Sequence, residues 1–183
     1  MSILIKNILL EQEEISIRIE ENKIAKIDKS LPEGADIIID GKDKAVFPGF
    51  VNGHTHAGMT LFRGFAEDLP LESWLKEKIW PAEAKHTDET IYWGTKLACL
   101  EMIETGTTCA NDMYFNHRQV YRAISEMGLR AIISPAFFDF FEPGRTEKAK
   151  RMMEENFKFS QSSGSMVRYA IAPHAIYTVS AEL

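Results

Sequence analysis

The sequence predicts an α/β fold in which a small strand-rich segment, residues 1–47, precedes a longer strand-and-helix segment, residues 48–183. In the first segment, short runs alternate between polar and apolar residues, which is the pattern of half-buried strands. In the second, four short apolar runs alternate with longer helical stretches. Strands that alternate with helices indicate parallel pairing through right-handed crossovers.

The first segment is expected to form a small antiparallel sheet. Its strands are predicted over residues 3–10, 14–20, 23–28 and 35–40, with a hairpin turn at Glu21-Asn22. Such a sheet is too small to be stable alone, so we expect it to pack on something else.

The second segment alternates strands near residues 47–56, 107–111, 129–134 and 166–172 with helices at 71–79, 88–105, 116–127 and 145–162. Trp80-Pro81 is expected to stop the helix before it, because proline cannot continue the hydrogen-bond ladder. Thr87 is a candidate N-cap, with Thr90 in the capping-box position. Gly106 and Gly128 are candidate left-handed helix ends. A further helix is expected to begin at Thr178.

Two architectures fit this alternation, a doubly wound open sheet and a (β/α)8 barrel. No glycine-rich phosphate loop follows the first strand, as many open sheets would have. Polar residues instead follow several successive strands: His54, His56, Asp112, Ser134 and His174. Sites assembled from many strand ends are typical of the barrel. Asp112 is expected either to hydrogen-bond inside the pocket or to anchor a neighbouring loop.

The composition narrows the functional classes. The net charge of −6 and pI of about 5.4 argue against a nucleic-acid or anionic-membrane binder. No apolar run is long enough to span a membrane, and no secretory signal is visible at Met1. The two cysteines, Cys99 and Cys109, form no Cys-x-x-Cys pair, which suits a reducing cytoplasm. We therefore expect a cytoplasmic protein with a small-molecule ligand.

The most informative motif is His54-Thr55-His56 at the end of an apolar run. Side chains two residues apart on a strand point to the same side, so both imidazoles could bind one metal ion. Both rings must be neutral to do so, and binding should weaken in acid. No nucleophile elbow, P-loop or His-x-Glu/Pro-Cys-x-x-Cys deaminase signature occurs.

Taken alone, the other candidates have ordinary structural explanations. Glu83 would be a solvated charge, Trp74 a packing residue, Arg145 a helix-capping residue and His174 a structural histidine. His86 and His117 lie beside helix starts and are interpreted as surface residues.

The chain resembles the amidohydrolase superfamily in Pro48-Gly49-Phe50-Val51-Asn52-Gly53-His54-Thr55-His56. Its continuation through Gly58–Gly64, Trp74-Leu75, Ile79–Glu83 and Ala172-Pro173-His174 resembles the 5′-methylthioadenosine/S-adenosylhomocysteine deaminases and their chlorohydrolase-like relatives. The resemblance covers essentially the whole chain. It implies a TIM-like (β/α)8 metal-dependent hydrolase barrel, about four βα units of which lie in residues 48–183. Residues 1–47 would then belong to a β-sandwich built from both ends of the intact chain.

The resemblance also implies the chemistry. One divalent metal, Zn²⁺ or sometimes Fe²⁺, would be held by His54, His56 and two later residues, and would activate a water that attacks C6 of adenine. Glu83 would hold the ribose hydroxyls, Trp74 would line the nucleoside pocket, and Arg145 and His174 would contact the substrate. The expected catalytic glutamate and histidine would lie beyond Leu183, so no catalytic residue is assigned within the chain.

Two departures from the family qualify this expectation. Ser134-Pro135-Ala136 stands where some adenosine-type members carry an arginine, which affects recognition of the S-adenosylhomocysteine tail. The chain is also under half the family length, so we expect it to be inactive alone. The alternatives are a guanine or triazine deaminase or a chlorohydrolase of the same superfamily, or a non-catalytic fragment. The expected assembly is a homo-oligomer of the intact protein or, for half of a split enzyme, a pair with a complementing C-terminal half.

Overall fold

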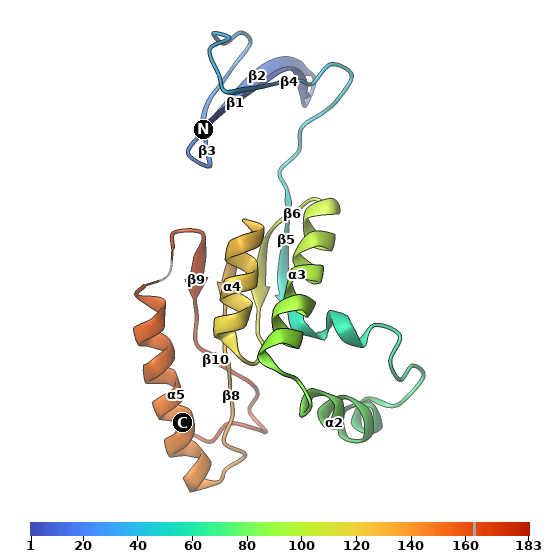
Figure 1. Ribbon diagram of the computed structural model, residues 1–183, viewed down its shortest axis with the longest axis vertical. Coiled ribbons are helices and arrows are strands. Elements are labelled where there is room, and N and C mark those ends of the chain that lie inside the picture. Colours follow the sequence, from blue (N-terminus) through green and yellow to red (C-terminus); the bar gives the residue numbers. More distant parts are fainter. Residues whose placement is uncertain (163) are drawn as a thin grey trace. The chain divides into compact units, whose positions relative to one another are not determined.

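The computed structural model describes residues 1–162 and 164–183 and divides into two compact units, Met1–Pro48 and Gly49–Leu183 (Figure 1). Each unit has its own sheet and its own hydrophobic core.

The first unit is a four-stranded sheet of order β3-β2-β1-β4. Its strands are β1 (Ser2–Leu10), β2 (Glu13–Glu20), β3 (Lys23–Asp28) and β4 (Ile37–Asp40). The predicted hairpin turn is confirmed, because Glu21 and Asn22 both have positive φ, at 48° and 64°. Apolar side chains of β1 and β2 form a small core around Ile8, Ile15 and Ile17.

The prediction of a purely antiparallel first sheet is wrong. β4 pairs parallel to β1, with Ile3 opposite Ile37. The reason is that residues 29–36 carry the chain back to the starting end of β1. There Asp36 accepts a hydrogen bond of 2.6 Å from the backbone N–H of Ser2. This crossover makes the sheet mixed.

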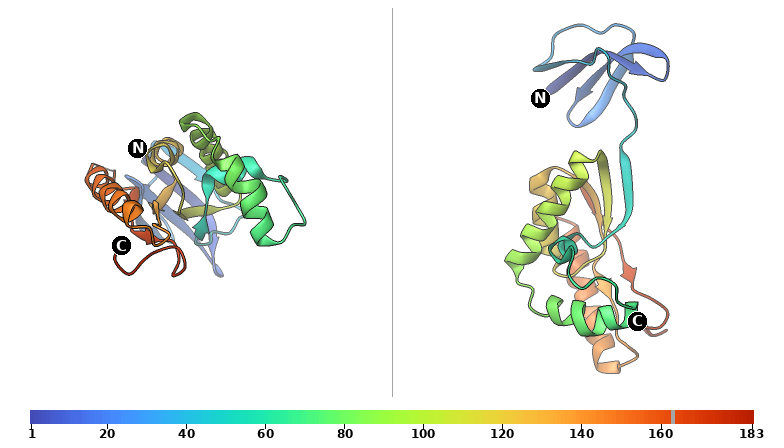
Figure 2. Two further views of the ribbon diagram at one scale, coloured as in Figure 1. Left: turned by 90° about the horizontal axis from the view of Figure 1, so that it is seen from below. Right: turned by 90° about the vertical axis from the view of Figure 1, so that its right-hand side faces the viewer.

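The second unit contains the predicted parallel sheet. Its strands β5 (Phe50–Thr55), β6 (Thr107–Asp112), β7 (Arg130–Ile133) and β9 (Val167–Tyr169) pair in parallel in that order. The helices α3 (Asp88–Glu104), α4 (His117–Met127) and α5 (Pro143–Ser160) lie along one face of this sheet (Figures 1 and 2). The strand order follows the sequence without a reversal, so these four strands contain no topological switch point.

The sequence did not predict a second short pair of strands, β8 (Ala136–Phe137) and β10 (Ala172–Pro173). They follow β7 and β9 and also pair in parallel. Pro135 separates β7 from β8, and its missing N–H interrupts the ladder. His174 N–H then donates to the carbonyl of Phe137 at 3.0 Å, so the hydrogen bonding between the two segments continues one residue beyond β10.

The predicted helix signals around α3 and α4 are confirmed. Thr90 N–H donates to Thr87 Oγ1 at 3.2 Å and Thr87 N–H donates to Thr90 Oγ1 at 2.8 Å, which completes a capping box. Gly106 and Gly128 follow the two helices with φ of 84° and 70°, conformations that glycine adopts without strain.

The predicted stop at Trp80-Pro81 is wrong. The chain passes from α1 (Leu71–Ser73) through the π-helix η2 (Trp74–Ile79) into α2 (Trp80–Glu83). Trp80 N–H donates to the carbonyl of Leu75 five residues back, whereas Ala84 N–H donates to Trp80 four residues back. Pro81 lies where the spacing changes, at the start of α2, where a missing N–H is tolerated.

The predicted helix from Thr178 is also wrong. Residues 178–183 contain no helix in the structure. The Thr178 carbonyl accepts N–H hydrogens from Asp139 and Phe140, and the Ser180 N–H and hydroxyl both donate to Asp139. These bonds hold the segment against the start of α5 in place of helical pairing.

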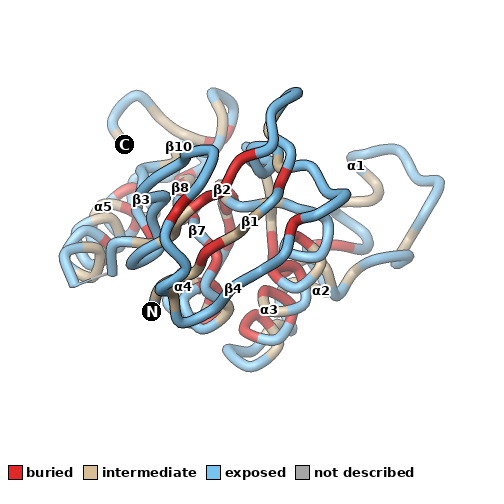
Figure 3. The backbone as a smooth tube through the Cα atoms, turned by 90° about the horizontal axis from the view of Figure 1, so that it is seen from above, coloured by how far each residue is buried: buried red, intermediate tan, exposed pale blue. Residues whose placement is uncertain are grey.

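The core of the second unit lies between the sheet and helices α3 and α4 (Figure 3). Its fully buried members include Cys99, Val120, Ile124 and Ile133. Among the described residues, no helix is both long and apolar enough to cross a membrane.

Candidate metal centre and its pocket

The two histidines of the motif converge at the end of β5. The Nε2 atoms of His54 and His56 lie 3.3 Å apart. Nδ1 of His56 lies 2.5 Å from the carbonyl oxygen of Met113, which can only accept, so Nδ1 must carry the proton. In the neutral ring, Nε2 of His56 therefore carries no proton and faces Nε2 of His54. A second hydrogen bond that fixes the tautomer in this way is typical of metal-ligating histidines.

Asp112 holds the chain immediately after this pair. Its fully buried side chain accepts a hydrogen bond of 2.6 Å from the Ala57 N–H, while Met113 N–H donates to Thr55 at 3.0 Å. Of the two roles expected for Asp112, the structure shows the loop anchor. Burial raises the pKa of Asp112 to about 7, against the opposing effect of the Ala57 hydrogen bond.

The chemistry of the pair fits a divalent transition metal. Two neutral imidazoles suit Zn²⁺ and Fe²⁺. Within the part of the chain that the structure describes, no group of three or more His, Cys, Asp or Glu side chains could hold a metal ion. As a candidate metal site, the pair of His54 and His56 offers two donors, fewer than the four that Zn²⁺ usually takes.

A pocket of about 410 Å³ opens beside His54 and is also lined by Asn111, Ser134 and His174. Asn111 Nδ2 donates to the carbonyl of Gly53 at 3.2 Å, and Ser134 Oγ donates to Asn111 Oδ1 at 3.4 Å. Because parallel strands end at one edge, residues at the ends of β5, β6, β7 and β10 meet here. This confirms that polar residues from successive strand ends gather in one place.

Glu83 lies close to the histidine pair and is not a solvated surface charge. It is half-buried, and Tyr114 donates its hydroxyl hydrogen to Oε1 at 2.8 Å. The Tyr114 ring in turn lies 6.3 Å from the ring of His56, between centroids. Burial raises the pKa of Glu83, opposed by the Tyr114 bond and the charge of His56. Sequence reasoning missed Tyr114, whose position directly after the Asp112 strand end was the available signal.

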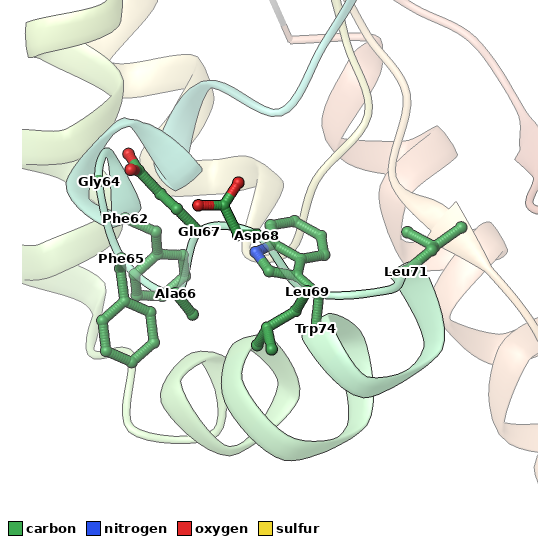
Figure 4. Close-up of a pocket in the computed structure, with 9 residues that line it drawn as sticks. All are labelled: Phe62, Gly64, Phe65, Ala66, Glu67, Asp68, Leu69, Leu71 and Trp74. Carbon is green, nitrogen blue, oxygen red and sulfur yellow. The ribbon is translucent and has the colours of Figure 1, made fainter.

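Trp74 lies at a second pocket, of about 500 Å³, together with Phe62, Phe65 and Leu69 (Figure 4). It is the first residue of the π-helix η2, and π-helical turns are frequent at functional sites. Glu67 and Asp68 add two carboxylates to this pocket. The structure connects the pocket to His56 through a row of rings: Phe62 with His86 at 4.9 Å, His86 with Tyr114 at 6.2 Å, and Tyr114 with His56.

Arg145 lines neither of the two pockets. It lies in the first turn of α5, where Nε bonds Glu142 at 2.6 Å and the guanidinium stands 5.4 Å from the ring centre of Phe140. These local contacts are those of a helix-start residue.

The interpretation of His86 and His117 as surface residues is wrong. His86 stacks on Phe62, and burial lowers its pKa. His117 packs against Phe159 and Tyr169, and burial lowers its pKa to about 4, with a smaller effect of Arg118. The aromatic residues that cover them, Phe62 for His86 and Phe159 and Tyr169 for His117, lie far away in the sequence, so the local sequence did not reveal this burial.

Comparison with known families gives one matching model, the amidohydrolase family, over residues 45–183. Curated relatives include the 5-methylthioadenosine/S-adenosylhomocysteine deaminase 1 of Archaeoglobus fulgidus, 48% identical over 90% of this chain and 38% of its own. They also include the 5′-deoxyadenosine deaminase of Methanocaldococcus jannaschii, 46% identical over 99% of this chain and 44% of its own. The chain thus spans about two fifths of the length of these relatives.

Solved structures share the fold. An adenosine deaminase from Xanthomonas campestris with bound zinc matches with a TM-score of 0.84 and 31% identity, over 97% of this chain and 44% of its own. A guanine deaminase from C. acetobutylicum with bound guanine matches with a TM-score of 0.83 and 20% identity, over 100% of this chain and 48% of its own.

Proposed function

The chain belongs to the amidohydrolase family, and on this basis we propose that the protein is a metal-dependent aminohydrolase that removes the 6-amino group of an adenosine derivative as ammonia. The observation that carries the proposal is the convergence of His54 and His56 at the end of β5, in a chain about 45% identical to adenosine-type deaminases. The substrate class is 5′-methylthioadenosine, S-adenosylhomocysteine or 5′-deoxyadenosine, the compounds named for those relatives.

The proposed architecture is the first half of a (β/α)8 barrel preceded by part of a β-sandwich. Strand order without reversal and helices on a single face of the sheet both support the barrel over the doubly wound alternative. The mixed sheet of residues 1–48 supplies the sandwich strands.

The proposed cofactor is one Zn²⁺ ion, with Fe²⁺ as the other family metal. His54 and His56 would hold it through Nε2. When bound, such a metal lowers the pKa of water so that it attacks near neutral pH. The contribution of this chain is to fix the two ligands: the Met113 carbonyl sets the tautomer of His56, and Asp112 holds the backbone after it.

For substrate binding, we assign Glu83 to the ribose hydroxyls and Trp74 to the wall of the nucleoside pocket. The Tyr114 bond supports the role of Glu83, because the Tyr114 ring lies 6.3 Å from the ring of His56. Trp74 is supported by its pocket, which it shares with Phe62, the far end of the row of rings that runs through His86 and Tyr114 to His56. His174 would contact the substrate from the pocket beside His54. Arg145 is retained as a substrate contact that needs a rearrangement of its Glu142 ion pair.

The remaining proposals concern the partners of the protein and its location in the cell. The partners are a small nucleoside and either further copies of the intact protein or a chain that supplies the later barrel strands. A cytoplasmic location is supported by Cys99 and Cys109, both of which are free thiols.

The test is an assay of the whole gene product that contains these residues, loaded with Zn²⁺. The expected result is stoichiometric ammonia release and loss of adenine absorbance with the adenosine derivatives, abolished in a His54→Ala/His56→Ala variant. Guanine and a chlorotriazine serve as comparison substrates. Turnover of those two, with no change of adenine absorbance for any adenosine, would refute the proposal.

A further inference from the structure

Two successive residues, Met113 and Tyr114, connect the candidate metal centre with Glu83. The carbonyl oxygen of Met113 accepts the Nδ1 hydrogen of His56 at 2.5 Å. The hydroxyl of Tyr114 donates to Oε1 of Glu83 at 2.8 Å. Because both contacts come from the two residues directly after β6, they fix the position of the carboxylate relative to the imidazole.

The Tyr114 side chain has little freedom to move. It is buried, and its ring lies 5.1 Å from the Phe115 ring and 6.2 Å from the His86 ring, between centroids. The ring also rests against Gly58, where a Cβ would stand 2.5 Å from Cε1 of the tyrosine. The missing side chain at Gly58 thus leaves the space that the ring occupies, and the hydroxyl is held in one place.

The hydrogen bond between Tyr114 and Glu83 has one possible direction. An ionised carboxylate only accepts, so the hydroxyl must donate. Burial and the charge of Glu83 both raise the pKa of Tyr114 above its usual range, so the hydroxyl keeps its hydrogen. Among the described residues, no group donates to the other oxygen of Glu83, Oε2, although the side chain is only half-buried. Oε2 therefore remains as an acceptor for a ligand.

We propose that Tyr114 is a positioning residue: by holding Oε1 of Glu83, it places Oε2 to accept from a ribose hydroxyl at a fixed position relative to His56. This rests on the proposed function, which assigns Glu83 to the ribose. A carboxylate that is held before binding loses less side-chain freedom when the ligand arrives. In a nucleoside, a rigid base and one glycosidic bond join the reacting carbon to the hydroxyls. Tyr114 thereby favours nucleosides over free bases, which have no hydroxyl to donate.

The first test compares two ligands on the zinc-free whole gene product, so that neither ligand is consumed. The ligands are adenosine and 2′,3′-dideoxyadenosine, which lacks the two ribose hydroxyls. Tyr114→Phe should bind adenosine about threefold to tenfold more weakly than the wild type, the loss expected for one hydrogen bond, and should bind the dideoxy compound equally well. Tyr121→Phe is the matched control, because the Tyr121 hydroxyl is bonded to Gly164 N–H. Equal weakening for both ligands, or for neither, would overturn the proposal.

The second test separates positioning from direct contact with the ligand. In a Glu83→Ala background the Tyr114 hydroxyl has no carboxylate to hold, so adding Tyr114→Phe should leave the affinity for adenosine unchanged. The two substitutions are therefore expected to be non-additive. A further loss of affinity in the double variant would mean that the hydroxyl itself contacts the ligand, and the positioning role would be wrong.

The third measurement needs no substitution at Tyr114. In the wild type, the carboxyl ¹³C resonance of Glu83 should move when adenosine is added and stay when 2′,3′-dideoxyadenosine is added. The same response to both ligands would overturn the proposal, even if Tyr114→Phe fails to fold.

Activity tests the proposed function separately. If the wild type binds adenosine but releases no ammonia from any adenosine derivative when loaded with Zn²⁺, the proposed function fails, while the binding data still decide the role of Tyr114. If the wild type binds neither nucleoside, both are refuted.

Discussion

Tyr114 and Glu83 are joined by a hydrogen bond of 2.8 Å between the tyrosine hydroxyl and Oε1 of the carboxylate. The bond connects the end of β6 with the end of α2, two elements separated in sequence by the whole of α3. It gives the half-buried carboxylate a fixed donor beside the ring of His56.

Replacing Tyr114 with phenylalanine should raise the pKa of Glu83. Burial already raises this pKa, and the Tyr114 bond opposes that effect by stabilising the carboxylate. Without the hydroxyl, only the weaker influence of the His56 charge remains to favour ionisation. Carboxyl ¹³C NMR titration of Glu83 measures the shift. Tyr121→Phe is the matched control, because Tyr121 accepts from Gly164 N–H and is not bonded to Glu83. An unchanged titration in Tyr114→Phe would mean that the bond does not form in solution.

Alanine at Gly58 should displace the Tyr114 ring. A Cβ at Gly58 would stand 2.5 Å from Cε1 of Tyr114, whose side chain is buried and cannot swing into solvent. Overpacking of this kind costs about 1–3 kcal/mol of unfolding free energy, which urea unfolding measures. The Glu83 titration should move as well, because its donor moves. Gly144→Ala is the control, since nothing lies within 4 Å of a Cβ there. Equal stabilities of the two variants would contradict the packing.

Zinc added to the protein should perturb His54 and His56 together. Their Nε2 atoms lie 3.3 Å apart and can face one ion. We expect either single alanine variant to weaken Zn²⁺ binding by more than about tenfold, as measured by calorimetry or imidazole NMR, with reversal by a chelator. Protons compete with the metal for the rings, so binding should weaken in acid. His174→Ala should bind zinc like the wild type. Retention of zinc affinity in the His54→Ala/His56→Ala protein would place the metal elsewhere.

The free energy of unfolding of the second unit should decrease as the pH is lowered, because His117 takes up a proton more readily in the unfolded chain. Burial lowers the pKa of His117 in the folded protein from 6.5 to about 4. Between these values the unfolded chain binds a proton that the folded protein does not. This contribution is therefore complete above 6.5 and declines as the pH falls towards 4.

The measurement is the urea midpoint at about pH 7 and about pH 5. His117→Phe retains an aromatic ring against Phe159 and Tyr169 and cannot titrate, so its midpoint should fall less between the two conditions. The carboxylates contribute to the acid response of both proteins alike. An identical fall in the two would show that His117 is not buried in its neutral form.

Local signals predicted much of the fold. The Thr87–Thr90 capping box and the glycines at 106 and 128 follow from patterns within a few residues. The parallel pairing of the four strands follows from their alternation with helices. Features that depend on distant segments were missed. The helix continues through Pro81 because of its π-helical spacing, and residues 178–183 fold onto Asp139 instead of forming a helix.

For the site, the sequence by itself predicted the His54–His56 pair and its position at the end of a strand. The two-residue period of a strand and the acceptor chemistry of imidazole are local properties. They are sufficient to predict that His54 and His56 point to the same side and form one candidate metal-binding pair. Only the tertiary structure decided the tautomer of His56 and the surroundings of Glu83. Met113, Tyr114 and Thr178 make hydrogen bonds whose partners are brought together by strand pairing and loop closure. Tautomers and burial depend on those contacts, and local patterns in a single chain do not encode them.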